Sequence, residues 1–510
     1  MPVYPNQSSS PRELSQDSHF APRTVPQPSF SVWDRFRGKG RLRVSWTQSL
    51  IAILRSSYLN VLLAFVPVAW GVHFVGTVSH TVQFGSCFIA LIPLSKLLDY
   101  GGENLALYCR KDIGDLIIVT LNNAIQAILS IVLLAHCQLK LVQSTIVGVI
   151  LLRLLLVPAC ALITGGARIA AQELHPHLAT LNEALLTIGL LAILLPATFF
   201  AALNSSNSGG GGAVSDDVRG DILKVSRGLA VILLAMYLCS RVFLHNPPNQ
   251  SEGIHERKEA PAELKEMVQK MAEEDLEVNP WACLVLLVFT VALVAVIAQF
   301  LVESTESMQE RHQLKEEWFG LFMLPFISFS AECIISAVYF VHFYLQQYLG
   351  PGTSLSPPKT LAKARSVDLS IQFLIFWMPL LVLLAWCSHR PLSLLFDLFE
   401  VVALIGATFL VNNVTADAKT SAMTMLALYF MIALTAWFYS GQPAIATMAA
   451  CVSIHDSLAA EGVPPGSTFT NISFGGFHAT LDESQVSNFT EHLLNLKKLY
   501  DVLLLVEQSP

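Results

Sequence analysis

The chain has 510 residues, of which 53% are hydrophobic and only 14% are charged, and its mean hydropathy is +0.54. Soluble proteins carry roughly a quarter charged residues, so a soluble protein of this size would lack the polar side chains needed to cover its surface. The net charge of −7 gives no basic surplus that would attract nucleic acid. Composition therefore excludes a soluble multidomain enzyme, a disordered regulator and a nucleic-acid-binding protein.

The cysteines and the motif inventory restrict the chemistry further. The nine cysteines form no C-x-x-C pair, so we expect neither a disulfide framework nor a zinc site. The sequence also has no His, Asp and Glu cluster with metal-ligand spacing and no nucleophile motif. An enzyme is therefore the least favoured class.

The apolar residues fall in blocks long enough to cross a bilayer. A hydrocarbon core about 30 Å thick needs roughly 20 apolar residues as helix. The second block is the least certain, because Lys96 and Asp99 close it early. Block length and the lack of strict alternation favour helices over barrel strands, so we predict an all-α membrane protein with about eleven transmembrane helices. The predicted spans are 57–75, 81–98, 114–136, 142–165, 180–203, 222–244, 281–302, 317–343, 367–387, 393–414 and 421–439.

Charge in the loops predicts the orientation. Residues 1–44 are polar and rich in Ser and Pro, which indicates a disordered tail rather than a signal peptide. The basic end of this tail lies in the cytosol by the positive-inside rule. The odd number of spans then places the C-terminal tail in the lumen, where the sequons at Asn471 and Asn488 would be open to glycosylation. Basic residues that agree with this orientation are Arg35, Arg37, Lys39, Arg41 and Arg43 before the first span, and Arg110, Lys111, Arg168, Lys359, Lys363 and Arg365 in alternate loops.

Two polar loops help to divide the chain. Residues 204–220 contain a Ser/Asn/Gly run that is typical of a flexible connection. Residues 246–279 hold nine acidic and four basic side chains, and 257–277 read as an amphipathic helix. We interpret this loop as a solvated linker between two halves, with a cation-attracting regulatory segment as the alternative. The predicted organisation is a basic tail (1–44), a first transmembrane half (45–245), an acidic cytosolic linker (246–279), a second half (280–440) and a lumenal tail (441–510).

A short motif recurs in the third and eighth spans. Residues 124–130 and 330–336 both match A/S-x-Q/E-x-I-I/L-S. An offset of five spans reverses the orientation of a segment in the membrane, so the chain is predicted to hold two inverted five-helix repeats after one extra N-terminal helix. Secondary transporters built in this way bind their substrate between the repeats near the midplane. Gly320 and Pro325, just ahead of the second copy, are residues that can break a helix.

Glu332 lies in the middle of the eighth span. A carboxylate at this depth costs several kcal/mol unless it is paired, hydrated or protonated, so it marks a candidate functional site. Arg153 in the fourth span is the expected counter-charge, and Glu103 is a second carboxylate near a membrane boundary.

Neutral polar residues at comparable depth are candidate oxygen ligands, and each is equally well explained as an interhelical hydrogen-bonding residue. His136, Asp397 and Glu400 lie near span ends, where we expect them to reach water. The neutral candidates are Asn123, Gln126, Gln299 and Gln372.

Ordered segments across residues 57–440 resemble the calcium/proton antiporters (the CAX family) of fungal and plant vacuoles, within the cation/calcium exchanger superfamily. GGENLA at 101–106 is similar to the A-T-E-x-L-A stretch of that family. The acidic loop occupies the place of the acidic linker of the family. Further similar segments are SSYLNVLLAFVPVAW (56–70), the stretch 141–172 with its double glycine, AQFLVES (298–304), EEWFGLFMLPF (316–326), SIQFLIFWMPLLVLL (370–384) and PLSLLFDLFEVV (391–402).

The ion-binding motifs depart from this family. In G-N-A-x-E-L the asparagine is kept as Asn123, and Gln126 replaces the glutamate. In G-N-A-A-E-H only Ala331 and Glu332 remain. The motif G-S-S-I-Q keeps Ser370, Ile371 and Gln372, whereas Arg153 replaces the asparagine of the fourth span and Gln299 replaces the glutamate of A-E-F-L-V.

These departures change the charge of the site. Calcium takes six to eight oxygen ligands, with carboxylates supplying negative charge. Gln126 removes one charge and one titratable group, which leaves Glu332 as the retained carboxylate. An inward-pointing Arg153 would neutralise it, because unit charges 4 Å apart interact by about 4 kcal/mol at intermediate dielectric.

The resemblance implies a vacuolar-type Ca²⁺/H⁺ antiporter that works by alternating access, with no cofactor apart from the transported Ca²⁺ and H⁺. It implies Glu332 as ion ligand and proton acceptor, Asn123, Gln126, Ser370 and Gln372 as oxygen ligands, and Glu103 on the proton path. The implied partners are the lipid bilayer and cations. Two alternatives stay open: a non-transporting member that acts as a membrane scaffold or regulator, and an exchanger for another cation. An Arg153 bonded to Glu332 would favour the former.

Overall fold

The structure is a computed structural model. It describes residues 44–75, 78–109, 111–166, 176–206, 215–245, 278–349, 363–413, 418–452, 470–474 and 477–481. The basic cluster at 35–43, most of the acidic linker and Asn488 lie outside the described residues.

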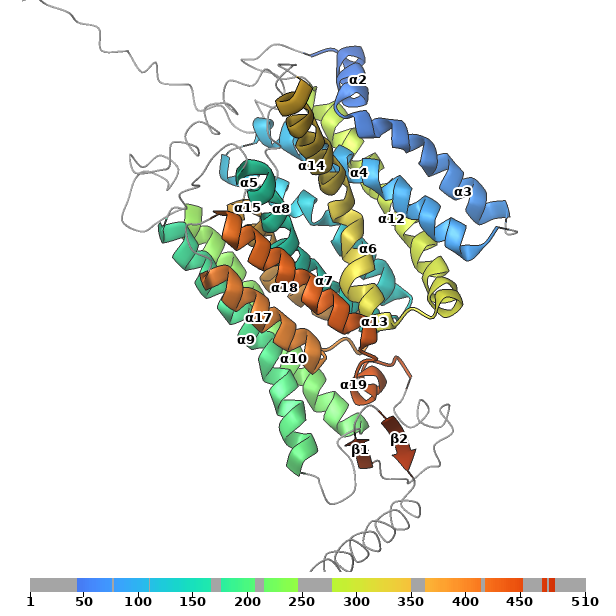
Figure 1. Cartoon of the computed structure of the whole chain (residues 1–510), viewed down its shortest axis with the longest axis vertical. Coiled ribbons are helices and arrows are strands. Elements are labelled where there is room, and N and C mark those ends of the chain that lie inside the picture. The colour runs from blue at the N-terminus through green and yellow to red at the C-terminus, as the bar shows by residue number, and fades with distance from the viewer. Residues whose placement is uncertain are drawn as a thin grey trace, which may run out of the picture.

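The described chain is helical apart from one strand pair, and Figure 1 shows its helices arranged as one bundle. The first half contains α2 (Trp46–Arg55), η1 (Tyr58–Ala64), α3 (Phe65–Val75), α4 (His80–Tyr108), α5 (Lys111–Asn122), α6 (Ala124–Ala135), α7 (Leu139–Leu151), η2 (Leu152–Leu156), α8 (Val157–Gly166), α9 (Pro176–Ser206) and α10 (Asp216–His245). The second half contains α12 (Pro280–His312), α13 (Glu316–Trp318), η4 (Phe319–Met323), α14 (Leu324–Leu349), α15 (Lys363–Gln372), η6 (Phe373–Trp377), α16 (Met378–Cys387), α17 (Leu398–Asn413), α18 (Ala418–Phe438) and α19 (Pro443–Met448).

All eleven predicted spans fall on helices. Within the described residues, eight helices are long and apolar enough to cross a membrane, and the bent pair α5–α6 makes a ninth. The predicted tenth and eleventh spans are the shorter apolar helices Leu398–Asn412 and Ala422–Phe438. The chain is therefore a multi-pass membrane protein whose spans are helical.

The prediction that Lys96 and Asp99 end the second span is wrong. Helix α4 continues without interruption to Tyr108. The two side chains form an ion pair within the helix, with 2.8 Å between Lys96 Nζ and Asp99 Oδ2, and they are only 10% and 15% exposed. Because each neutralises the other, the pair can remain inside the bundle.

Three other features differ from expectation. The polar 204–220 connection is shorter than predicted, because α9 continues to Ser206 and α10 begins at Asp216, where two aspartates favour a helix N-terminus. The eighth span is wound into a π-helical turn at Gly320 and is not broken. The C-terminal tail holds an antiparallel strand pair, β1 (Thr470–Phe474) and β2 (Phe477–Leu481), with Asn471 opposite Thr480.

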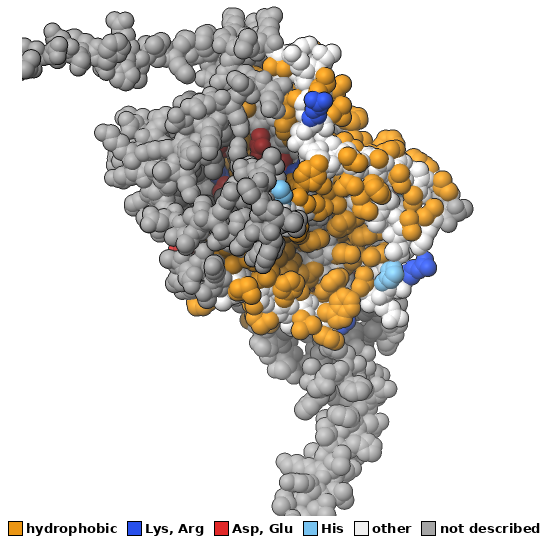
Figure 2. All heavy atoms as spheres, turned by 45° about the horizontal axis from the view of Figure 1, so that its top comes forward, with side chains coloured by type: hydrophobic (Ala, Val, Ile, Leu, Met, Phe, Trp, Pro, Cys, Tyr) orange, Lys and Arg blue, Asp and Glu red, His pale blue; other side chains and the backbone are white. Residues whose placement is uncertain are grey.

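The surface of the bundle is hydrophobic, as expected for a protein surrounded by lipid. Figure 2 shows a broad face covered by hydrophobic side chains, with Lys, Arg and His at its borders. Apolar side chains of α3 and α12 are widely exposed because lipid replaces water around them. They include Val68, Phe74, Val75, Val285, Val288 and Phe289, which are 49–75% exposed.

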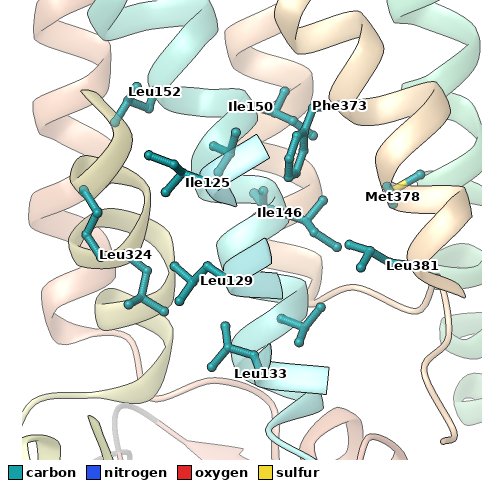
Figure 3. Packing of buried hydrophobic residues seen from close by; sticks show 14 of the residues in the cluster. Ile125, Leu129, Leu133, Ile146, Ile150, Leu152, Leu324, Phe373, Met378 and Leu381 are labelled. Atoms are coloured by element: carbon teal, nitrogen blue, oxygen red, sulfur yellow. The ribbon is translucent and has the colours of Figure 1, made fainter. Parts of the chain in front are cut away.

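The interior is packed from both halves of the chain. Figure 3 shows Ile125, Leu129 and Leu133 of α6 facing Leu324 on one side and Phe373 and Met378 on the other. Ile146 and Ile150 of α7 fill the space between them. Side chains of the two predicted repeats thus pack into one core, which we call the inter-repeat interface.

The fourth and ninth spans carry the same irregularity. Each contains one π-helical turn, η2 in the fourth span and η6 in the ninth. Such turns often mark functional sites. Their five-span separation is the separation of the sequence repeat.

The end of the bundle that carries α19 and the strand pair, at the bottom of Figure 1, is held together by polar and covalent contacts. Asp397 accepts hydrogen bonds from the Tyr439 hydroxyl (2.6 Å) and the Gln442 amide (2.9 Å). Glu400 is 1% exposed and accepts from Ser144 Oγ at 2.5 Å. The expectation that Asp397 and Glu400 reach water is wrong, because protein donors replace it; His136 is exposed as expected.

A disulfide joins Cys137 to Cys451 at the same end of the bundle. The sequence predicts no disulfide framework, and it gives no indication of this single pair. The two residues are 314 positions apart in sequence, so no local spacing pattern could reveal them. The bond links the α6–α7 turn of the first repeat to the segment that follows α19.

Candidate functional site

The site is built where the third span bends. Helices α5 and α6 meet at 52° around Asn123. A bend interrupts the regular helical hydrogen bonding and leaves backbone carbonyls available to other partners. Asn123 is fully buried, and its side chain lies in the inter-repeat interface.

Arg153 comes from the π-helical turn η2 and points into the protein, not toward lipid. It is 6% exposed. Its guanidinium donates to the Asn123 side-chain oxygen, to the Asn122 carbonyl at 3.1 Å and to the Leu369 carbonyl at 3.4 Å. Arg153 therefore connects the bend of the third span with α15 of the other repeat.

Asn123 and Gln372 form the next part of the network. The amide nitrogen of Asn123 donates to the side-chain oxygen of Gln372 at 2.5 Å. The amide nitrogen of Gln372 donates to Thr120 Oγ1 (3.0 Å) and to the Tyr237 hydroxyl (3.1 Å). Two residues that match family motifs are thus bonded to each other across the interface.

Gln126, one turn beyond Asn123, faces the eighth span. Its amide nitrogen donates to the carbonyls of Leu324 (3.2 Å) and Pro325 (3.1 Å) and to Ser328 Oγ (2.8 Å). Its side-chain oxygen is buried and has no hydrogen-bond partner among the described residues. The amide nitrogen of Gln126 thus supplies hydrogen bonds to three oxygen atoms. A glutamate at this position would place its carboxylate oxygens against these oxygens, and it would need a proton or a bound cation to lie there.

Glu332 lines a small polar cavity of about 30 Å³. This volume exceeds the roughly 10–15 Å³ that one water molecule needs. The cavity lies among helices of both repeats. Its lining residues are Ser95, Asp99, Asn122, Leu152, Arg153, Val157, Ser328, Phe329, Glu332, Ser366 and Leu369.

The electrostatics of this cavity involve two basic and two acidic groups. Arg153 is attracted most strongly by Glu332 and less strongly by Asp99. Lys96 interacts most strongly with Asp99 and next with Glu332. If all four are ionised, their charges sum to zero, and Glu103 attracts Lys96 as well.

Asp99 is the cavity residue that sequence reasoning missed. Its position at the expected end of a span suggested a boundary carboxylate, and only its spacing from Lys96 hinted at an internal pair. The turn of α4 that carries Asp99 and Ser95 faces Glu332 across the cavity. A carboxylate three residues after a lysine inside an otherwise apolar block was the available signal.

The other predicted site residues lie at different distances from this network. Ser370 is buried and donates to the Ser366 carbonyl in its own helix at 2.9 Å, next to the cavity. Glu103 is exposed on α4 and does not line the cavity. Gln299 is exposed and donates to Glu303 of the same helix, so it lies outside the inter-repeat interface.

Comparison with known proteins shows which family has this architecture. A family model described as sodium/calcium exchanger protein matches residues 79–245. The vacuolar calcium ion transporter of Cryptococcus neoformans var. grubii is 30% identical over 492 residues, which cover 81% of this chain and 78% of the relative. The Ca²⁺/H⁺ antiporter of Synechocystis sp. is 30% identical over 393 residues, which cover 76% of this chain and 98% of that protein. The chain belongs to the calcium/proton antiporter family.

The fold of this antiporter family is also recognised in three dimensions. The solved structure of native YfkE superposes with a TM-score of 0.55 at 21% identity, and the match covers 75% of this chain and all of that one. At this identity the likeness concerns the fold. It agrees with the all-helical, multi-pass architecture described above.

Proposed function

We propose that this protein is a secondary transporter that moves a cation, with Ca²⁺ as the first candidate, across the vacuolar membrane in exchange for protons. Relatives described as vacuolar calcium ion transporters, from Cryptococcus neoformans and from Schizosaccharomyces pombe, support both the substrate and the membrane. The observation that carries the proposal is the position of Glu332. Its carboxylate lines a polar cavity between helices of both repeats, in the middle of a predicted span.

The proposed mechanism uses one carboxylate for both ions. Glu332 binds the cation in one half of the cycle and a proton in the other, so that each ion leaves as the other arrives. Asn123, Gln126, Ser370 and Gln372 are proposed as neutral oxygen ligands, and Glu103 remains a proposed group on the proton path. Alternating access exposes the cavity first to one side and then to the other.

The proposed orientation places the N-terminus in the cytosol and the C-terminal tail in the lumen. The Cys137–Cys451 disulfide supports it, because disulfides persist in compartments of the secretory pathway and are rare in the cytosol. Both cysteines follow odd-numbered spans, the third and the eleventh. This is the side that the positive-inside rule assigns to the lumen.

Proton-gradient-driven ⁴⁵Ca²⁺ uptake into vesicles tests the transport function. We expect Glu332→Gln to lower uptake at least tenfold, because the amide can neither neutralise the cation nor carry the proton. Glu303→Gln is the matched control, since Glu303 is exposed on α12 away from the cavity, and it should transport like the wild type. Equal uptake by wild type and Glu332→Gln would remove Glu332 from the mechanism.

The cavity electrostatics favour a second candidate: a family member that transports another cation or no cation. Arg153 enters the inter-repeat interface, and no group of three His, Cys, Asp or Glu side chains converges within the described part of the chain. Purified protein in liposomes, screened with Ca²⁺, Mn²⁺, Na⁺ and K⁺, separates these options. Transport of a monovalent ion alone would favour the other-cation exchanger, and transport of none of the four would favour the scaffold or regulator.

A further inference from the structure

Two buried side chains of this protein donate hydrogen bonds to oxygen atoms in the inter-repeat interface. Arg153 donates to Asn123 Oδ1 and to the Asn122 and Leu369 carbonyls. Gln126 donates to two carbonyls of the eighth span and to Ser328 Oγ. Six oxygens from both repeats are therefore bonded to nitrogen donors of the chain itself.

Oxygen atoms are the ligands that Ca²⁺ takes in proteins. Backbone carbonyls released at irregular turns of spanning helices are the groups that coordinate cations in secondary transporters. In this protein such carbonyls accept hydrogen bonds from the Arg153 guanidinium and the Gln126 amide instead. Since arginine keeps its charge in proteins, the guanidinium supplies a permanent positive charge at this place.

Acidic side chains near the cavity already have basic partners. Arg153 is attracted by Glu332 and Asp99, and Lys96 forms an ion pair with Asp99. A divalent cation entering this cavity would meet the positive charge of Arg153, which lines it. Its gain from Glu332 would be offset by repulsion from Arg153, and it would have to displace N–H donors from the oxygens that it needs.

We propose that Arg153 is a tethered counter-ion that takes the place of a divalent cation in the inter-repeat interface, with the Gln126 amide in a supporting role. A divalent cation binds there only when the guanidinium withdraws. This inference rests on the proposed function in one respect, that the interface is the path of the transported cation. Arg153 is then the residue that determines which charge the site accepts.

Equilibrium binding of ⁴⁵Ca²⁺ to the purified full-length protein in nanodiscs tests the proposal. We expect Arg153→Asn to bind Ca²⁺ at least tenfold more tightly than the wild type, because the substitution removes the charge and offers an amide oxygen. Adding Gln126→Glu should increase the affinity again. Arg153→Lys keeps the charge and should bind as weakly as the wild type.

Three controls locate the effect. Arg227→Asn makes the same change on α10, where the guanidinium stacks over Trp386, and should leave Ca²⁺ binding unchanged. Adding Glu332→Gln to Arg153→Asn should abolish the gained affinity. If Arg153→Asn fails to fold, Arg153→Met removes the charge while keeping most of the side-chain volume, and Ca²⁺ should then raise its melting temperature but not that of the wild type.

The outcomes separate this inference from the exchanger proposal. If the wild type binds and transports Ca²⁺ through Glu332 and Arg153→Asn binds no more tightly, the tethered counter-ion is overturned and the exchanger stands. If the double variant Arg153→Asn/Gln126→Glu also fails to gain Ca²⁺ affinity over the wild type, the inference is overturned by a second route. A gain that requires Glu332 supports the inference even where the wild type transports no Ca²⁺.

Discussion

Single residues decide how much charge this membrane interior holds. Lys96 and Asp99 stand three residues apart on α4, are mostly buried and form an ion pair. Breaking a buried pair by removing one partner costs more than replacing both, because the remaining charge stays buried without compensation. The pair also borders the cavity of Glu332, so its integrity affects the proposed site.

We therefore expect Lys96→Met to destabilise the protein by about 3 kcal/mol, at the lower end for a buried pair because Arg153 also attracts Asp99. Lys96→Met/Asp99→Leu should recover most of this loss. Thermal unfolding in detergent measures both. The comparison variant is Lys224→Met, which breaks another Lys–Asp pair with side chains 75% and 64% exposed and should cost less than about 1 kcal/mol. A similar loss for Lys96→Met and Lys224→Met would contradict the argument.

The residues of the candidate site were only partly predictable from the sequence. Depth in an apolar block pointed to Glu332, Arg153 and Gln126, because each is a polar group at a place where lipid or packed side chains are expected. Their bonding partners were not predictable, since backbone carbonyls such as that of Leu369 carry no sequence signal. Asp99 was missed because a charge at a span end and a charge in a buried pair look alike in sequence.

At the scale of elements, the close crossing of α7 and η4 holds the two repeats together. Gly148 of α7 lies against the Leu321 backbone, and Gly320 of η4 lies against Ser144. A Cβ at Gly148 would collide with the Leu321 carbonyl and with the Pro325 ring. Small residues allow helices to approach this closely in membranes.

Gly148→Ala should therefore destabilise the protein by about 1–3 kcal/mol, the usual cost of forcing extra atoms into a packed interior. Gly406→Ala is the paired variant, because a Cβ there meets nothing within 4 Å and alanine favours a helix by up to about 1 kcal/mol. Melting temperatures and size-exclusion profiles in detergent compare them. If Gly148→Ala unfolds no earlier than Gly406→Ala, the crossing tolerates a larger residue.

The elements themselves were the most predictable level. Hydrophobic length located a helix in each of the eleven predicted spans, eight of which are long enough to cross a membrane on their own, because the bilayer sets that length physically. The π-helical turns and the bend at Asn123 were not predictable, since they depend on how neighbouring spans pack. Gly320 and Pro325 suggested a break in the eighth span, whereas the structure has a π-helical turn there and the bend in the third.

At the scale of the whole molecule, the disulfide and the free cysteines allow the orientation of the bundle in the membrane to be tested. Cys137 and Cys451 lie at the end that we assign to the lumen, whereas Cys109 follows α4 at the end that we assign to the cytosol. In sealed vacuolar vesicles with the cytosolic face outward, a membrane-impermeant maleimide should label Cys109 without detergent.

Cys137 and Cys451 should resist an impermeant reductant until detergent opens the vesicles, and then gain two maleimide adducts. Mass spectrometry of the peptides reads out both results. Cys109→Ser is the control for the external signal. Reduction and labelling of Cys451 in intact vesicles would show that the orientation is opposite to the one proposed.

The bond between Cys137 and Cys451 also restricts how the halves can move. Segments joined at one rim can rotate about that rim but cannot separate there. The α6–α7 turn and the segment after α19 must therefore stay together throughout a transport cycle. Opening of the cavity toward the lumen would then have to involve other helices at that end, with the covalent link serving as a fixed point.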